Sequence, residues 1–147
     1  MMNEADFVAL SEHLEEVRPI FDDFCTRHGF VYVDRRSLGR YPRIRIERPG
    51  APSLWFDLWM EVGKDGQRFE RFRRDLPYEL SAGASLVLQD GSKYGVRFDK
   101  CFQCFSGEPF DQVGAILQDK LETHLRTLEQ WDAQYLKEHG ERVQLGA

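Results

Sequence analysis

Residues 54 to 62 read Leu-Trp-Phe-Asp-Leu-Trp-Met-Glu-Val, and this stretch alternates between two kinds of side chain. The even positions are all apolar: Leu54, Phe56, Leu58, Met60 and Val62. The odd positions combine tryptophan with acid: Trp55, Asp57, Trp59 and Glu61. Because successive side chains of a strand point to opposite faces of a sheet, the stretch predicts a strand with one face on an apolar core.

The segment before it predicts the partner strand. Residues 43–47 read Arg-Ile-Arg-Ile-Glu and alternate as well, and Pro-Gly-Ala-Pro at 49–52 separates the two segments. If that connection is a hairpin, its register must keep the two isoleucines on the apolar face, because a slip of one residue would send one set into water. The register then opposes Arg43 to Trp59, Arg45 to Asp57, and Glu47 to Trp55.

The second face of this predicted hairpin, turned away from the core, carries the candidate binding residues: Trp55, Trp59, Arg43, Arg45, Asp57 and Glu61. Neighbouring tryptophans leave more apolar area than a monomer usually exposes, and tryptophan with arginine is typical of an interface hot spot. The residues also fit ordinary cross-strand pairing, in which an arginine over an indole adds roughly 0.5 to 1 kcal/mol. An exposed Arg45–Asp57 pair adds less than about 1 kcal/mol. Both interpretations stay open.

Helical periodicity marks both ends of the chain. Between Asp6 and His28, apolar residues recur at steps of three or four, which predicts a long N-terminal helix with a C-cap at Gly29. Pro19 predicts a kink near Arg18 or two abutting helices. The same spacing from Phe110 to Tyr135 predicts a second long helix that ends by Gly140.

Further strands fill the middle of the chain. Residues 30–33 are β-branched and aromatic, and 84–89 with 93–99 flank the turn residues Asp90-Gly91, which predicts another hairpin. Whether Gln67–Phe72 is a strand stays open. The expected fold is α+β in two layers: a mostly antiparallel sheet of five or six strands, with the long N- and C-terminal helices packed on one face. Residues 1–147 form a single domain in this interpretation, and the strand order is not predicted.

Composition restricts the functional classes. The chain has 147 residues, 41% hydrophobic and 31% charged, which is ordinary for one globular domain. No apolar run approaches the roughly 18 to 20 residues that cross a bilayer, and the acidic N-terminus is unlike a secretory signal. We therefore expect a cytosolic protein with reduced thiols. The net charge of −5 argues against general nucleic-acid binding and favours a basic protein partner.

No motif predicts a catalytic site or a bound cofactor. Cys101 and Cys104 have CxxC spacing, but no second ligand pair and no helix N-terminus accompany them, so we expect neither metal nor a required disulfide. His28 is expected to cap carbonyls in the last turn of the first helix, and His124 to be structural or solvated. We accordingly expect a protein that is not an enzyme.

Arginines form the strongest local charge feature: Arg35, Arg36, Arg40, Arg43, Arg45 and Arg48, followed by Arg68, Arg71, Arg73 and Arg74. Such a cluster could hold an anion, whether as a small-ligand protein or an enzyme. Carboxylates between the arginines, Glu47 and Asp57 among them, predict internal ion pairing instead.

In size, acidity and order of elements the chain resembles bacterial immunity proteins that block toxins, and also type III secretion chaperones that hold their effectors. The resemblance rests on no shared motif, so it carries over no site residue. It implies a small cytosolic protein-binding domain that engages a partner, or a second copy of itself as a homodimer, through the Trp/Arg sheet face.

Overall fold

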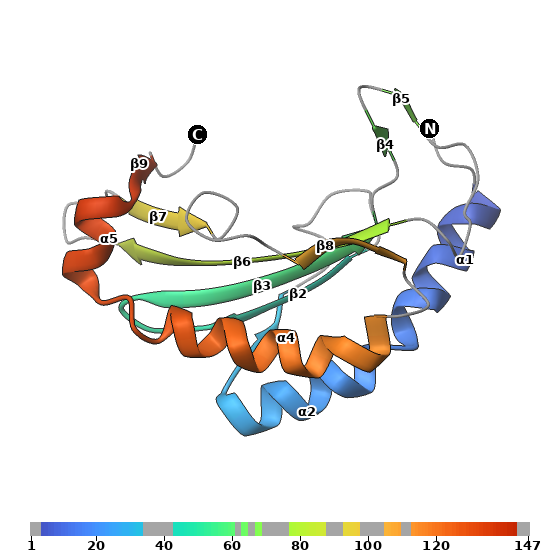
Figure 1. Cartoon of the computed structure of the whole chain (residues 1–147), viewed down its shortest axis with the longest axis horizontal. Helices are drawn as coiled ribbons and strands as arrows, with labels where there is room; N and C mark the ends of the chain where they lie inside the picture. Colours follow the sequence, from blue (N-terminus) through green and yellow to red (C-terminus); the bar gives the residue numbers. More distant parts are fainter. Residues whose placement is uncertain are drawn as a thin grey trace.

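The chain is α+β, with helices packed against an antiparallel sheet, as the computed structural model in Figure 1 shows. The structure describes residues 4–33, 43–60, 63–64, 67–68, 77–87, 93–97, 105–109 and 113–143. At some of these positions, Trp59 and Met60 among them, only the backbone is described. The elements in chain order are α1 Glu4–Glu15, α2 Arg18–His28, β1 Val31–Tyr32, β2 Arg43–Arg48, β3 Ser53–Met60, β4 Gly63–Lys64, β5 Gln67–Arg68, β6 Pro77–Val87, β7 Lys93–Arg97, β8 Phe105–Pro109, α4 Val113–Leu128, α5 Ala133–His139 and β9 Glu141–Val143.

The main sheet has the strand order β1-β2-β3-β6-β7-β9, with β8 also paired to β6. All of these pairings are antiparallel. The described sheet has seven strands and β4 pairs with β5 separately, so the predicted five or six strands are not confirmed. Strand β6 begins at Pro77 rather than Ala84, so the sequence interpretation missed its first seven residues. The proline at its start and the small residues at 81–83 give a weak strand signal. Of the open segment Gln67–Phe72, only β5 lies within the described residues.

The predicted hairpin register is confirmed. Strands β2 and β3 oppose Arg43 to Trp59, Arg45 to Asp57 and Glu47 to Trp55. Ile46 lies opposite Phe56, so the apolar sets share one face as the alternation required.

Neither terminal helix is continuous. The N-terminal segment forms two abutting helices, with Pro19 in the first turn of α2, where its missing N–H costs nothing. Gly29 caps α2 in the left-handed conformation, at φ 74°, as expected.

The prediction of a single long C-terminal helix is wrong. Helix α4 ends at Leu128 and α5 begins after Asp132, whose side chain accepts a 2.8 Å hydrogen bond from the Tyr135 N–H. Trp131 and Leu136 remain buried across the break, which is why the apolar periodicity gave no sign of it.

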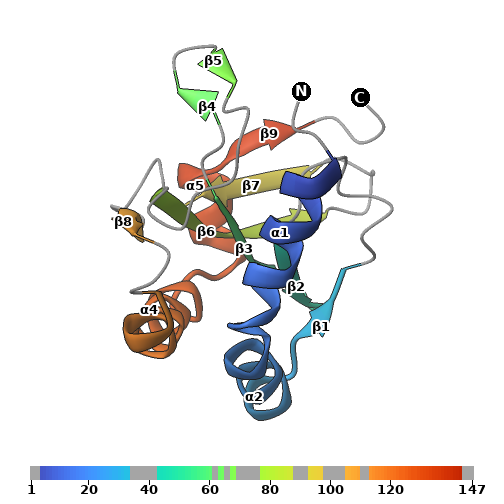
Figure 2. The same ribbon diagram turned by 90° about the vertical axis from the view of Figure 1, so that its right-hand side faces the viewer.

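The core lies between the sheet and helices α2 and α4, which run side by side along the same face (Figure 2). Phe24 of α2 meets Phe56 of β3 edge-on at 5.4 Å between ring centroids, and Phe30 lies against both. From α4, Leu117, Leu121 and Leu125 are buried in the same cluster. The predicted core face is confirmed at Ile44, Ile46, Phe56 and Leu58, while the Met60 side chain lies outside the described part. None of the described helices is long and apolar enough to span a membrane.

Candidate binding face of the sheet

The face of the sheet opposite α2 and α4, called here the second face, is built from cross-strand rows. One row runs Val31, Glu47, Trp55, Gly83 across β1, β2, β3 and β6. The next runs Arg45, Asp57, Ser81, and Val33 joins it because its N–H donates to the Arg45 carbonyl at 3.0 Å. These rows bring together three of the six predicted site residues, Arg45 from β2 and Trp55 and Asp57 from β3.

Asp57 is the centre of this face. Its Oδ2 lies 3.4 Å from Arg45 Nη1 and 3.6 Å from Arg43 Nη1. The Asp57 side chain is only 5% exposed. The expectation of an exposed Arg45–Asp57 pair is therefore wrong for Asp57. A buried carboxylate is costly unless cations and hydrogen bonds compensate it, and the two guanidinium groups supply that compensation.

Arg45 links Asp57 to the part of the face that reaches solvent. Its Nε donates to Glu47 Oε1 at 3.2 Å, and its guanidinium carbon lies 4.6 Å from the centre of the Trp55 ring. Trp55 and Arg45 are half-buried, and Glu47 is the most exposed of the three. Two ion pairs and a ring contact therefore fix Arg45, Glu47 and Trp55, called here the outer strip, in one arrangement before anything binds.

The remaining predicted site residues are only partly described. Trp59 has its backbone at the expected position opposite Arg43, without a described side chain, and Glu61 lies outside the described residues. Of the arginine cluster, Arg43, Arg45 and Arg48 have described side chains. Arg35, Arg36, Arg40, Arg71, Arg73 and Arg74 lie outside the described residues, and Arg68 is described only along its backbone.

Two polar groups on the second face have unused hydrogen-bonding capacity. Arg43 contacts Asp57 beyond hydrogen-bond range, and its buried Nε has no hydrogen-bond partner in the part of the chain described. Ser81, buried opposite Asp57, likewise has a hydroxyl without a partner among the described residues. Sequence reasoning missed Ser81, although extending the alternation of β6 backward from Ala84 would have placed it on this face.

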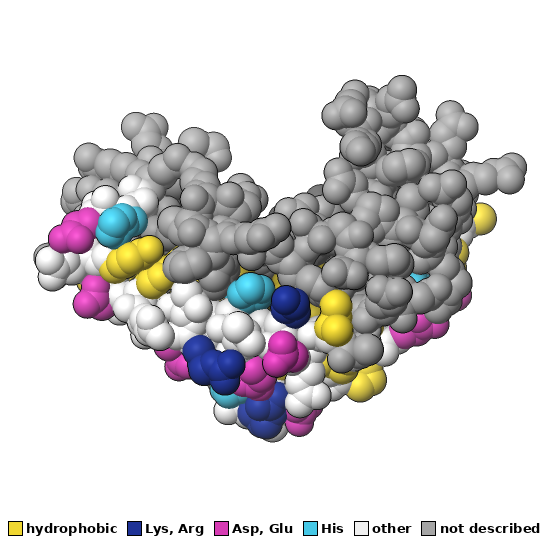
Figure 3. All heavy atoms as spheres, in the orientation of Figure 1, with side chains coloured by type: hydrophobic (Ala, Val, Ile, Leu, Met, Phe, Trp, Pro, Cys, Tyr) yellow, Lys and Arg dark blue, Asp and Glu magenta, His cyan; other side chains and the backbone are white. Residues whose placement is uncertain are grey.

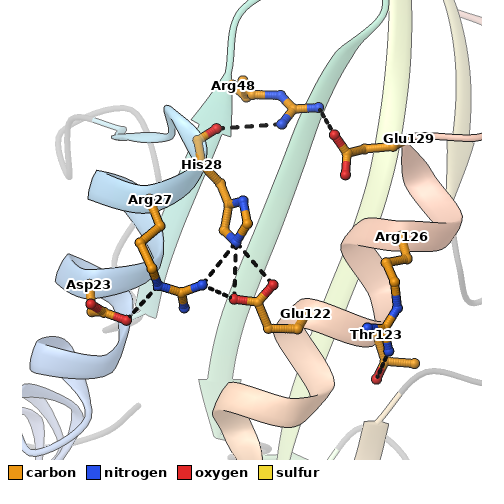
Figure 4. Close-up of polar contacts among 8 residues, drawn as sticks. All are labelled: Asp23, Arg27, His28, Arg48, Glu122, Thr123, Arg126 and Glu129. Atoms are coloured by element: carbon orange, nitrogen blue, oxygen red, sulfur yellow. Dashed lines mark hydrogen bonds and ion pairs between the residues drawn. The ribbon is translucent and has the colours of Figure 1, made fainter.

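A second polar cluster joins α2 to α4 at the molecular surface (Figure 4). The Glu122 carboxylate accepts from His28 Nε2 at 2.9 Å and pairs with Arg27, which also donates to Asp23. A carboxylate only accepts, so a hydrogen bond to Glu122 requires a proton on Nε2 of His28. The expectation that His28 caps carbonyls is therefore wrong: its ring turns toward α4 instead.

This cluster shifts the acidity of Glu122. Partial burial by itself raises the pKa of the carboxyl, but the hydrogen bonds and charges of His28 and Arg27 outweigh it, so the pKa is lowered overall. Above this cluster, Arg48 donates to the His28 carbonyl at 3.4 Å and to Glu129 at 3.2 Å. The sequence held no signal for these pairs, because they join residues far apart in the chain.

Cys25 and His124 also have shifted pKa values. Burial, with a smaller contribution from Asp22, raises the pKa of the Cys25 thiol to about 11, so it is a poor nucleophile at neutral pH. Burial and the charge of Lys120 lower the pKa of His124. Among the described residues, no three His, Cys, Asp or Glu side chains gather closely enough to hold a metal ion. Cys101 and Cys104 lie outside the described residues, so the expectation that they bind no metal stays a prediction.

Figure 3 shows acidic and basic side chains interspersed over the surface of α2 and α4, without a patch of one sign. Comparison with protein-family models, curated proteins and solved structures finds no match.

Proposed function

We propose that the chain is a small protein-binding domain and that a partner protein lies on the outer strip of the sheet. The observation that supports this most directly is the half-buried Trp55 ring held beneath the Arg45 guanidinium. Arg45 is itself held by Glu47 and Asp57, so the aromatic and cationic groups are already ordered. A partner that covers them loses little side-chain entropy on binding.

The finer version of the proposal is an immunity-type inhibitor that covers a toxin in the cytosol. A net charge of −5 attracts a basic partner over long range, and tryptophan and arginine then supply short-range contacts. A type III secretion chaperone that holds an effector is the rival version. Size, acidity and element order support both versions, and the identity of the captured protein separates them.

The test compares two changes on the outer strip with a matched change elsewhere. Trp55→Ala and Arg45→Gln should each weaken partner binding by about 2 kcal/mol or more, as truncations in a hot spot do. Arg126→Gln removes the same charge from an exposed position on α4, where the side chain donates to Thr123, and should leave binding unchanged. Pull-downs from the native cell followed by titration with the recovered protein measure the effect.

Stability is measured beside binding. Trp55→Ala should cost about 1 to 2 kcal/mol of unfolding free energy, below the loss for a fully buried ring, since Trp55 is half-buried. A large stability loss would show that Trp55 is a core residue. Binding that all three variants retain equally would refute the strip as an interface, and sedimentation of the wild type shows whether the occupant is a second copy.

Arg43 supports a second candidate function, a site for a small anion. Its buried Nε has no hydrogen-bond partner among the described residues and its Nη1 lies 3.6 Å from Asp57, so the guanidinium has unused capacity for a phosphate or carboxylate. Titration with inorganic phosphate, followed by calorimetry, should show binding in the wild type that Arg43→Gln removes. If neither protein releases or absorbs heat on titration, phosphate does not bind, and the arginine cluster serves internal ion pairing.

A further inference from the structure

We propose that β1 is a self-association edge, through which two copies of this chain join their sheets in antiparallel fashion about a twofold axis at Tyr32. Strand β1 is the outermost described strand in the sheet order, on the side of β2 away from β3 (Figure 2). Its two residues are exposed, Val31 at 56% and Tyr32 at 37%. Val31 adjoins Glu47 of the outer strip on the second face, but the contact proposed here is made along the strand edge, by the backbone of β1.

The register shows which backbone groups of β1 point outward. Val31 pairs with Glu47 and Tyr32 with Ile46, and the Val33 N–H donates to the Arg45 carbonyl. Hydrogen-bonded and non-hydrogen-bonded pairs alternate along an antiparallel ladder. Since the Val33 pair is hydrogen-bonded, the Tyr32 pair is not, and the N–H and C=O of Tyr32 face the open edge.

Tyr32 is held in place for such a contact. Its hydroxyl donates to Asp22 Oδ1 at 2.5 Å, and the Arg18 guanidinium lies 4.8 Å from the centre of its ring. Both contacts come from α2, below the strand. The edge is therefore fixed by side chains on the core side, and no described strand pairs with its outward backbone groups.

The occupant is a second copy because the edge is complementary to itself. In a twofold pairing, the outward N–H and C=O of Tyr32 bond to the same groups of the second copy. Val31 then lies opposite Val33 of the second copy in a close, non-hydrogen-bonded pair, which covers the exposed valine on both sides. Arg18 and Asp22 both contact Tyr32 and carry opposite charges, so a twofold pairing at Tyr32 brings charges of both signs from each copy to the contact.

The short edge also predicts the strength of the contact. With only a reciprocal pair of backbone bonds and a valine pair on each side, the interface belongs to the small, weak class. We expect a dimer that forms at high protein concentration and dissociates on dilution, with a Kd in roughly the micromolar range or weaker.

The decisive comparison is Tyr32→Pro against Tyr32→Ala. Both lose the ring and its bond to Asp22, but only proline removes the outward N–H, and proline is tolerated on an edge strand where that group faces solvent. Sedimentation across a concentration series should show at least tenfold weaker dimerisation for Tyr32→Pro than for Tyr32→Ala. Equal association of the two variants, or a wild type that stays monomeric throughout, would overturn the proposal.

A second pair of variants tests the edge even if Tyr32→Pro fails to fold. Val31→Asp places two acids at the twofold contact and should weaken dimerisation at least tenfold, whereas Val87→Asp changes the same residue type at the same 56% exposure on β6 and should not. Dimerisation of Val31→Asp equal to that of Val87→Asp would refute the edge. Trp55→Ala should leave dimerisation unchanged, so failure of this edge is distinguishable from failure of the outer strip.

Discussion

The two faces of β3 bury neighbouring residues by opposite means. Phe56, on the core face, is fully buried among the rings of Phe24 and Phe30. Asp57, the next residue, is buried almost as deeply on the second face, beside Arg43 and Arg45. Removing apolar area from water is favourable by itself, whereas burying a carboxylate is tolerated only with counter-charges. Depth of burial alone therefore does not tell which face is the core.

The strongest test of this contrast is Phe56→Ala on the core face. Removing a fully buried phenylalanine loses its transfer free energy and leaves a cavity between α2 and the sheet, so we expect a loss of about 3 to 5 kcal/mol in unfolding free energy. Val87→Ala, at an exposed position on β6, should stay within about 0.5 kcal/mol of the wild type. Urea denaturation measures both, and an unchanged midpoint for Phe56→Ala would contradict the two-layer core.

Asp57→Ala tests the other face. It leaves two half-buried arginines without their shared acid, and because both keep some contact with water, we expect a loss of about 2 kcal/mol, below the range for fully buried pairs. Glu47→Ala removes a more exposed acid from the same arginine and should cost less than about 0.5 kcal/mol. If the two variants lose equal stability, Asp57 behaves as a surface acid and the contrast between the faces fails.

The sequence predicted which residues share a face but not how deeply the second face is covered. A period of two and the requirement to bury Ile44 and Ile46 were enough to fix the β2–β3 register, because a slip would expose one set. The burial of Asp57 depends on packing over the second face, about which alternation carries no information. Its expected exposure was wrong for that reason.

The helical layer was less predictable than the sheet. Pro19 marked the first break because proline has a local effect on the backbone. Asp132 marked the second break equally locally, as an N-cap, but the buried Trp131 and Leu136 kept helical spacing across it and concealed the end of α4. The pairing of His28 with Glu122 joins α2 to α4 and depends on their packing, which no local pattern specifies.

A smaller loss of stability is expected at Glu122, whose carboxylate is paired like that of Asp57 but lies nearer the surface. Its carboxylate also meets two basic side chains, His28 and Arg27, but it is 27% exposed, where Asp57 is 5% exposed. Solvent screens such a pair, so Glu122→Gln should cost less than about 1 kcal/mol at pH 7. The same contacts at greater burial therefore account for the larger loss expected at Asp57.

The sign of the pH dependence follows from the lowered pKa of Glu122 in the folded state. A carboxyl whose pKa is lower folded than unfolded adds stability above its unfolded pKa, and this is lost as the pH falls through the folded value. The difference in unfolding free energy between wild type and Glu122→Gln should thus be constant above about pH 5 and shrink as the pH falls below the ordinary glutamate pKa of about 4.3 and through the lower folded value. Glu138→Gln, an exposed acid hydrogen-bonded to Gln134, should match the wild type at pH 7. Urea denaturation at each pH measures the difference, and a gap that persists unchanged at pH 3 would mean that Glu122 acts through packing and not through its charge.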